Sequence, residues 1–179
     1  MKGEASSARR RSRRAALQAL YSADVHERAT GAPGSPLAAL DALAEHFELA
    51  PGARAFAEEL VKGVAAERAA LDARLVAVAR NWRLERMAHV DRNLLRLAAW
   101  EILFAGTPPA VAIDEAVELA REFGDDASPR FVNGVLDALV RSAADAVAPE
   151  RAGARDPGAS AGARGPNESA GARGPRSGA

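Results

Sequence analysis

The chain has 179 residues, 48% of them apolar, and its 24 Lys and Arg residues are matched by 24 Asp and Glu residues. It contains no cysteine, which excludes a disulfide framework, a thiolate nucleophile and a cysteine-ligated zinc site. No apolar run approaches the roughly 20 residues of a membrane span, and the start of the chain lacks the apolar segment of a signal peptide. These features predict a soluble cytoplasmic protein with one domain and a core of ordinary size.

The zero net charge hides a segregation of charge along the chain. Residues 1–14 carry six Lys or Arg and one Glu, and residues 150–179 carry five Arg and three acids. The body between them holds 13 basic and 20 acidic residues. A basic end on an acidic body produces a directional field, so we expect a polyanion to approach by the N-terminus.

The first predicted helix covers about residues 8–29, after a flexible N-terminus at residues 1–7. Ser6 and Ser7 are possible N-caps, and no glycine or proline follows until Gly31. Five arginines open this helix, although the positive end of a helix dipole disfavours cations by roughly 0.3–1 kcal/mol each. A bound polyanion is the simplest reason for this placement.

A helical wheel divides this segment into two faces. Ala16, Leu20 and Ala23 form a stripe suited to a core, while a flank beside it collects Arg10, Arg11, Arg14, Gln18 and Tyr21. Guanidinium groups pair with phosphate, an amide can bond a base edge, and a tyrosine ring can stack on an unstacked base. The pattern favours single-stranded RNA. The alternative is a solvated basic face with Tyr21 half-buried at its edge.

The remaining periodicities are helical as well, which predicts an all-α chain. We expect further segments at about residues 36–49, 53–80, 84–87, 91–105, 110–123 and 128–148. Gly63 is a possible weak point in the long third helix. Asp91 and Ser128 are expected to cap the helices that follow them, and Trp82 and Trp100 are assigned to packing.

The composition changes at about Pro149. The segment Ser-Ala-Gly-Ala-Arg-Gly-Pro occurs at 160–166 and again at 169–175, and nothing in this tail is suited to a core. We expect residues 149–179 to be disordered. The tail either solubilises the protein without a further role or adds weak, unspecific affinity for RNA.

The sequence gives little support for a catalytic site or a metal site. The three histidines, His26, His46 and His89, lie far apart in the sequence, and no two have the spacing of metal ligands on a helix. The chain has no glycine-rich phosphate loop and no dinucleotide fingerprint. We therefore predict no catalytic residue, no cofactor and no metal site.

Three stretches together carry a family pattern in the matching order and spacing. They are Arg9-Arg10-Arg11-Ser12-Arg13 with Leu20-Tyr21-Ser22, Asn81-Trp82 through Asp91-Arg92 to Glu101-Ile102-Leu103, and Pro109–Arg121 with Phe131–Asp137. Over roughly residues 8–142 the chain resembles the bacterial transcription antitermination factor NusB family. The resemblance implies about seven helices packed as two three-helix bundles, within a domain at residues 8–148.

The resemblance also implies a function. The family binds the boxA element of nascent ribosomal RNA leaders as single-stranded RNA, together with the small-subunit ribosomal protein NusE. The pair then joins the elongating RNA polymerase with other Nus factors and suppresses termination, so the expected protein is not an enzyme. Whether the free protein is a monomer or a homodimer stays open.

Residues are carried over from the family by position. The matching RNA-binding positions in the first helix are Arg9, Arg10, Arg13, Gln18 and Tyr21, and candidates near the last helix are Arg130, Phe131 and Asn133. Asp91 is the expected contact with the protein partner. Phe131 could instead belong to the core, and Asn133 could serve the backbone conformation.

Some residues depart from the family pattern, and two other functions compete. The segment Asp126-Ala127-Ser128-Pro129 differs from the longer polar loop of the family, which affects the RNA contacts expected there. The same helical domain also precedes certain ribosomal RNA cytosine methyltransferases, but that function needs a second α/β domain. The other competitor is a protein–protein adaptor whose arginines are only solvated.

Overall fold

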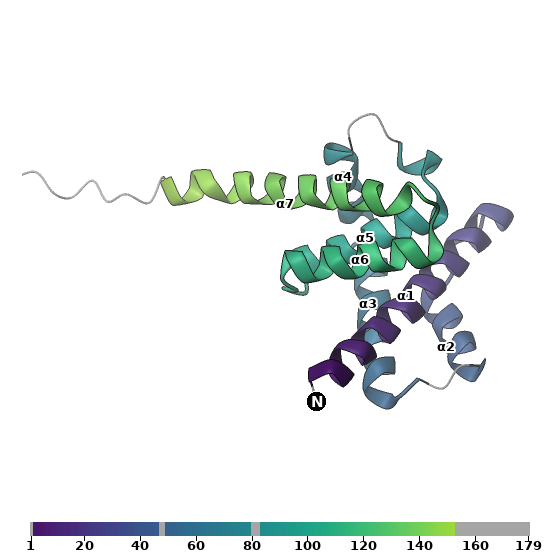
Figure 1. The fold of residues 1–179 in the computed structure, drawn as a ribbon. Helices are drawn as coiled ribbons and strands as arrows, with labels where there is room; N and C mark the ends of the chain where they lie inside the picture. Colours follow the sequence, from purple (N-terminus) through teal and green to yellow (C-terminus); the bar gives the residue numbers. More distant parts are fainter. Residues whose placement is uncertain (1, 47–48, 80–82, 153–179) are drawn as a thin grey trace, which may run out of the picture.

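The computed structural model of the chain describes residues 2–46, 49–79 and 83–152. All regular structure in these ranges is helical, which confirms the all-α prediction (Figure 1). The elements are α1 Lys2–Thr30, α2 Pro36–His46, α3 Pro51–Ala66, α4 Arg68–Val78, the short 3₁₀ helix η1 Leu84–Arg86, α5 His89–Leu103, α6 Pro109–Phe123 and α7 Ser128–Ala152. No helix in the described ranges is long and apolar enough to cross a membrane.

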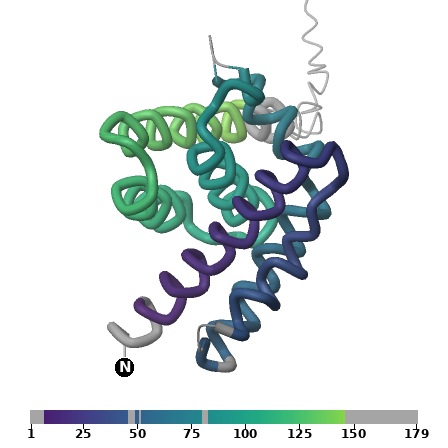
Figure 2. Tube along the Cα trace, turned by 90° about the vertical axis from the view of Figure 1, so that its right-hand side faces the viewer, coloured from purple at the N-terminus to yellow at the C-terminus, as the bar shows by residue number. Residues whose placement is uncertain are grey.

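The helices form two groups of three. Helices α1, α2 and α3 contact one another, and so do α5, α6 and α7, with α4 packed on α5 and α7. The two groups meet where α1 and α3 lie against α5. Figure 2 shows α1 crossing beside α3, with α6 and α7 on the far side of α5. The expectation of two three-helix bundles is confirmed.

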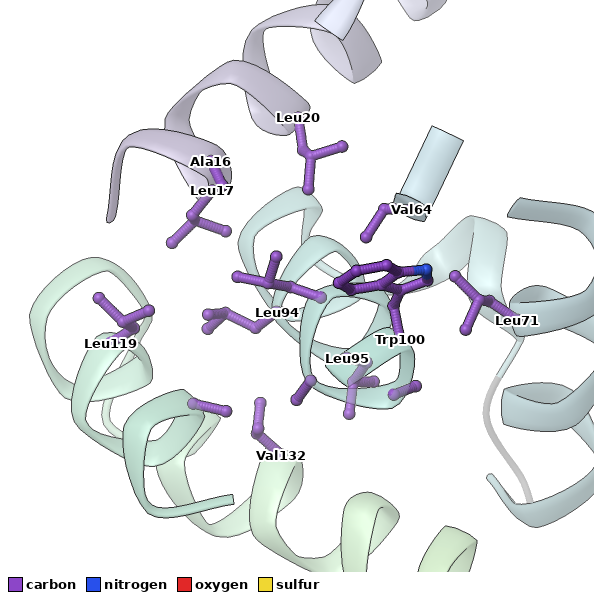
Figure 3. Packing of buried hydrophobic residues seen from close by; sticks show 14 of the residues in the cluster. Ala16, Leu17, Leu20, Val64, Leu71, Leu94, Leu95, Trp100, Leu119 and Val132 are labelled. Carbon is purple, nitrogen blue, oxygen red and sulfur yellow. The ribbon is translucent and has the colours of Figure 1, made fainter. Parts of the chain in front are cut away.

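The core is built around α5. Every residue from Asp91 to Glu101 is buried, as expected for a helix that is apolar over most of its circumference. Around Leu94 and Leu95 of α5 lie side chains from four other helices, among them Leu20, Val64, Leu119 and Val132 (Figure 3). Each fully buried Leu or Val contributes roughly 1.5–3 kcal/mol relative to leaving it exposed, so these contacts hold the two bundles together.

The long third helix expected from the sequence is two helices. The break falls at Glu67, between α3 and α4, and not at Gly63. Gly63 is inside α3 and faces the indole of Trp100, because a Cβ built on Gly63 would lie 2.0 Å from Trp100 Cε2. The glycine allows a close approach of α3 to α5, and the packing role expected for Trp100 is confirmed. Trp82 lies outside the described residues.

Helix boundaries also differ from the expected ones. α1 begins at Lys2, upstream of Ser6 and Ser7, and α7 continues to Ala152, past the boundary expected at residue 148. Asp91 does not cap α5, because the residue before that helix is Ala88. The disorder and the role expected for the tail concern residues that lie almost entirely outside the described ranges.

At the start of α7, the side chains of Asp125 and Ser128 each accept a hydrogen bond from the backbone N–H of the other residue. The carboxylate of Asp125 accepts the N–H groups of Ala127 and Ser128, each at 2.9 Å, and Ser128 Oγ accepts the N–H of Asp125 at 3.0 Å. This is the reciprocal arrangement of a capping box, which satisfies free N–H groups at the start of a helix. The cap expected of Ser128 is therefore shared with Asp125.

Candidate nucleic-acid interface

The arginines of α1 do not share one environment. Arg13 is only 3% exposed, and it donates two hydrogen bonds to the carboxylate of Glu101 in α5, at 2.7 and 2.9 Å. Glu115 of α6 lies 3.6 Å from the same guanidinium. The charge of Arg13 is thus neutralised inside the protein, which disfavours a direct RNA contact, and the contact expected of it stays a prediction.

Arg10 and Arg14 lie on the exposed side of α1 and are paired to α6. Arg10 bonds Glu115 through two nitrogens, at 2.9 and 3.0 Å, while its side chain stays 48% exposed. The hydrogen bonds and charge of Glu115 raise the pKa of Arg10 above its usual value. Arg14 pairs with Glu122 and lies over the ring of Phe123, 5.7 Å from its centroid. Both cations are held in place but remain within reach of solvent.

Arg9 and Arg11 have no ionic partner in the described part of the chain. Arg9 is exposed, with its guanidinium 5.3 Å from the ring centroid of Phe56 in α3. That contact is a cation–π interaction, which orients the guanidinium without neutralising it. Arg11 is exposed on the opposite side of α1. These two residues are the free positive charges at this end of the helix.

One turn further along, α1 presents a polar and an aromatic side chain. Gln18 is partly exposed, and Tyr21 is 42% exposed. The Tyr21 ring meets the ring of His89 edge-on, with centroids 6.1 Å apart and planes at 78°. The prediction that Tyr21 is an accessible ring beside the arginines agrees with this geometry. Its stacking on a base stays a prediction.

Behind Tyr21 lies a buried polar cluster centred on Asp24. Its carboxylate accepts hydrogen bonds from Arg92 at 2.5 Å and from Asn93 at 3.1 Å, and it lies 2.9 Å from Nδ1 of His89. Burial alone raises the pKa of Asp24, but the hydrogen bonds of Arg92 and His89 outweigh it, so the pKa lies below its usual value. The cluster ties α1 to the start of α5 and fixes His89.

The candidates at α7 lie in a different environment. Arg130 and Asn133 are exposed, and Asn133 donates to Asp137 at 3.0 Å. Phe131 is half-buried against the core. With Arg130 it lines a groove between α7 and two residues at the end of α4, Val78 and the C-cap residue Ala79. For Arg130 and Asn133, the described residues show no hydrogen bond or ion pair with α1. Their RNA contacts stay a prediction.

Asp91 lies in the interior. It is 8% exposed, and its Oδ1 has no hydrogen-bond partner among the described residues. Burial raises its pKa, hydrogen bonding with Ser128 opposes that rise, and the charge of Asp125 adds to it. This buried position disfavours the expected direct contact with a protein partner, which stays a prediction. The Asp91 carboxyl group lies beside the α6–α7 connection, where it is hydrogen-bonded with Ser128.

Comparison of the sequence with known proteins identifies the family of this chain. A model of the NusB family matches residues 10–141. The "Transcription antitermination protein NusB" of Beutenbergia cavernae is 47% identical over 140 residues, which are 76% of this chain and 91% of that protein. The protein of the same name from Heliobacterium modesticaldum is 44% identical over 139 residues, covering 77% of this chain and 65% of that protein. The chain belongs to the NusB family.

Solved structures of this family share the fold. NusB of T. maritima is 32% identical, with a TM-score of 0.66, and the match covers 74% of this chain and 90% of that one. A complex of the antitermination factors NusB and NusE with double-stranded RNA contains a chain with 24% identity and a TM-score of 0.64, covering 75% and 97%. The family is one of transcription antitermination proteins and not of enzymes. Among the described residues, no group of acidic or histidine side chains could hold a metal ion.

Two residues of this NusB-family site were not candidates from the sequence. Glu101 neutralises Arg13, and His89 contacts Tyr21. The partner of His89 is Asp24, 65 residues away in the sequence, so no local pattern indicates this contact. The alignment of Arg13 with the core stripe of α1 was the one available signal for its burial.

Proposed function

We propose that this NusB-family protein acts in the cytoplasm as a transcription antitermination factor. It binds the boxA element of nascent ribosomal RNA leaders together with the ribosomal protein NusE, and joins the elongating RNA polymerase with other Nus factors. Support comes from the family and from the name of its curated relatives. The NusB–NusE complex with RNA, which shares the fold, is consistent with this assignment.

One observation carries the RNA-binding part of the proposal. The solvent side of α1 presents the unpaired cation Arg11, then Gln18, then the exposed ring of Tyr21, while the other unpaired cation, Arg9, is exposed on the opposite side of the helix. Cations bind phosphates, while an amide and an aromatic ring bind a base, so the order along the helix suits one RNA strand. Arg10 and Arg14 lie at the edge of this surface, where exchange of Glu115 or Glu122 for a phosphate costs an existing ion pair.

Arg13 has an indirect part in this proposal. Its buried pair with Glu101 anchors α1 to α5 and so sets the direction in which the neighbouring arginines point. Neutralisation of one α1 charge inside the protein also lowers the number of phosphates that the helix can bind. The interface proposed here therefore uses fewer cations than the arginine run contains.

A binding assay tests the proposal against a pure adaptor function. A gel shift compares an RNA that contains boxA with a scrambled RNA of the same length and composition, each with and without NusE. We expect a preference for the boxA RNA and a tighter complex when NusE is present. An adaptor would bind NusE and show no preference between the two RNAs. Arg11→Ala is the variant of choice, since this exposed residue has no described partner to lose.

A further inference from the structure

We propose that His89 is a further RNA-contacting residue, whose Nε2 accepts a hydrogen bond from the N–H group of a base that stacks on Tyr21. This inference deepens the RNA binding proposed above and rests on it. It adds a base-selective contact from α5 to a surface otherwise built from α1.

The orientation of the imidazole is set by the buried cluster behind it. Nδ1 of His89 lies 2.9 Å from Asp24 Oδ2, and the side chain of Asp24 is only 6% exposed. The two ring nitrogens point away from each other, so Nε2 points away from Asp24. The described residues provide no hydrogen-bond partner for Nε2, and the His89 side chain is 20% exposed. One edge of the ring is therefore fixed and the other is open.

The same contact decides the tautomer. Asp24 is a carboxylate, held by Arg92 and Asn93, and can only accept. The 2.9 Å contact is a hydrogen bond when the proton is on Nδ1, and Nε2 of that neutral tautomer carries a lone pair. Arg92 Nη2 also lies 3.1 Å from Nδ1, but its shorter hydrogen bond, at 2.5 Å, goes to Asp24 Oδ2, so we assign the tautomer from the contact between His89 and Asp24. Nε2 is an acceptor.

An acceptor at this place selects a particular ligand chemistry. Phosphate oxygens are acceptors only and are repelled by a lone pair, whereas the Watson–Crick edge of every base carries at least one N–H donor. The ring of Tyr21, 42% exposed and fixed edge-on to His89, offers its open surface to a base. A base stacked there has its edge beside the imidazole. His89 is then expected to affect base preference and not salt dependence.

A structural role for His89 makes a different prediction. If the imidazole only supports Tyr21 and joins α1 to α5, any aromatic ring of similar size preserves RNA binding. His89→Phe keeps an edge against Tyr21 but removes both nitrogens, so it separates the two roles. His26→Phe is the matched control, because His26 is exposed on α1 and has no side-chain partner among the described residues.

The test combines this variant with modified RNA. The probe is a boxA RNA and a series in which one adenosine at a time is replaced by purine riboside, or one uridine by N3-methyluridine, so that single N–H donors are lost. We expect His89→Phe to bind the unmodified RNA roughly 3- to 10-fold more weakly, the effect of one hydrogen bond, with an unchanged salt slope. One of the modified RNAs should bind the wild type more weakly by the same factor, and His89→Phe should bind that RNA as well as it binds the unmodified one.

A second measurement does not depend on the stability of the variant. The ¹⁵N resonances of His89 in the wild type report the state of each ring nitrogen, and Nε2 should shift on saturation with boxA RNA while Nδ1 stays protonated. Two results would overturn the inference and leave the proposed RNA binding in place. One is an Nε2 resonance that does not shift on RNA addition. The other is full RNA binding by a folded His89→Phe variant when the separate Tyr21→Ala variant binds more weakly. Failure of the wild type to prefer boxA RNA over the scrambled RNA overturns both.

Discussion

The guanidinium of Arg13 in α1 and the carboxylate of Glu101 in α5 form a bidentate ion pair, at 2.7 and 2.9 Å, although the two residues are 88 positions apart in the sequence. Only 3% of Arg13 and 1% of Glu101 is exposed. Thr107 donates to the same carboxylate at 3.2 Å, so the pair also holds the α5–α6 connection. The most basic segment of the chain therefore contributes one of its charges to the interior and not to a ligand.

Removal of one member of this pair should be strongly destabilising. Arg13→Met leaves the Glu101 carboxylate buried without its partner, and we expect a loss of about 3–5 kcal/mol in the free energy of unfolding. The double variant Arg13→Met with Glu101→Leu should recover much of that loss, because no charge then remains unpaired. Urea unfolding measures both. A loss below 1 kcal/mol for the single variant would contradict the role given to the pair.

The unpaired cations should determine the salt dependence of RNA binding. Each phosphate contact to a single strand contributes about −0.7 to the slope of log K against log salt. Arg11→Ala should make that slope shallower by about 0.7 and weaken all RNA sequences alike. Arg74→Ala is the control, since Arg74 is exposed on α4 without a described partner. Equal slopes for wild type and Arg11→Ala would remove Arg11 from the interface.

The tail should be dispensable for folding. Residues 153–179 contain no apolar side chain larger than alanine except in proline, so they have little to contribute to a core. Truncation after Ala152 should leave the thermal midpoint unchanged. A decrease of several degrees on truncation, measured by circular dichroism with full-length protein as reference, would show that the tail docks on the body.

Local patterns in the sequence were informative where a residue's environment is set by its own helix. Arg13 stands three residues before Ala16 and seven before Leu20, which puts it on the core stripe, so its burial could have been read from the wheel. Its neutralisation by Glu101 could not, because nothing local relates two positions 88 residues apart. The same limit applies to His89 and Asp24. The family resemblance supplied the bundle arrangement, which periodicity alone does not determine.

The predicted start of α5 at Asp91 is two residues too late, although Asp91 is a residue type that often caps helices. Because α5 begins at His89, Asp91 lies in its first turn and turns inward toward Ser128 instead of ending at the surface. Its change of environment is invisible in a local pattern, since the α6–α7 connection that covers it lies more than 30 residues further along the chain. The boundary, and with it the function assigned to the residue, depended on tertiary contacts.

The buried carboxyl of Asp91 leads to a pH-dependent prediction. Its folded pKa is raised above the unfolded value of about 3.9, so the ionised form is disfavoured in the fold. The cost is absent below the unfolded pKa and fully present above the folded one. Asp91→Asn should therefore be more stable than wild type at pH 7, by roughly 1 kcal/mol, and the difference should vanish as the pH falls below the unfolded pKa of about 3.9.

The control for Asp91 is Asp125, whose pKa is lowered by hydrogen bonds from the backbone N–H groups of Ala127 and Ser128. Asp125→Asn should have the opposite sign, with a loss of stability at neutral pH that disappears in acid, because the favourable charged form is removed. Urea midpoints from pH 2 to 8 compare the two variants with the wild type. Parallel pH profiles for wild type and Asp91→Asn would show that Asp91 ionises as freely in the fold as in the unfolded chain.

The contact between Gly63 and Trp100 gives the last prediction. A Cβ at position 63 would lie 2.0–2.4 Å from three atoms of the indole, far inside van der Waals contact, and Trp100 is itself 8% exposed and packed beside Val64 and Leu71. The indole belongs to the packed core, so Gly63→Ala should force α3 away from α5 or displace the ring. We expect a loss of about 1–3 kcal/mol, although alanine is the better helix former by roughly 1 kcal/mol.

Two further variants show whether the indole causes that loss. Trp100→Phe with Gly63→Ala should be less destabilised than the sum of the single variants, because the smaller ring leaves room for the methyl group. Gly52→Ala is the matched control: a Cβ there meets nothing within 4 Å, so we expect no loss. Urea unfolding followed by far-ultraviolet circular dichroism, which does not depend on the tryptophan, measures all four. A stabilised Gly63→Ala protein would show that α3 and α5 are not in the close contact described.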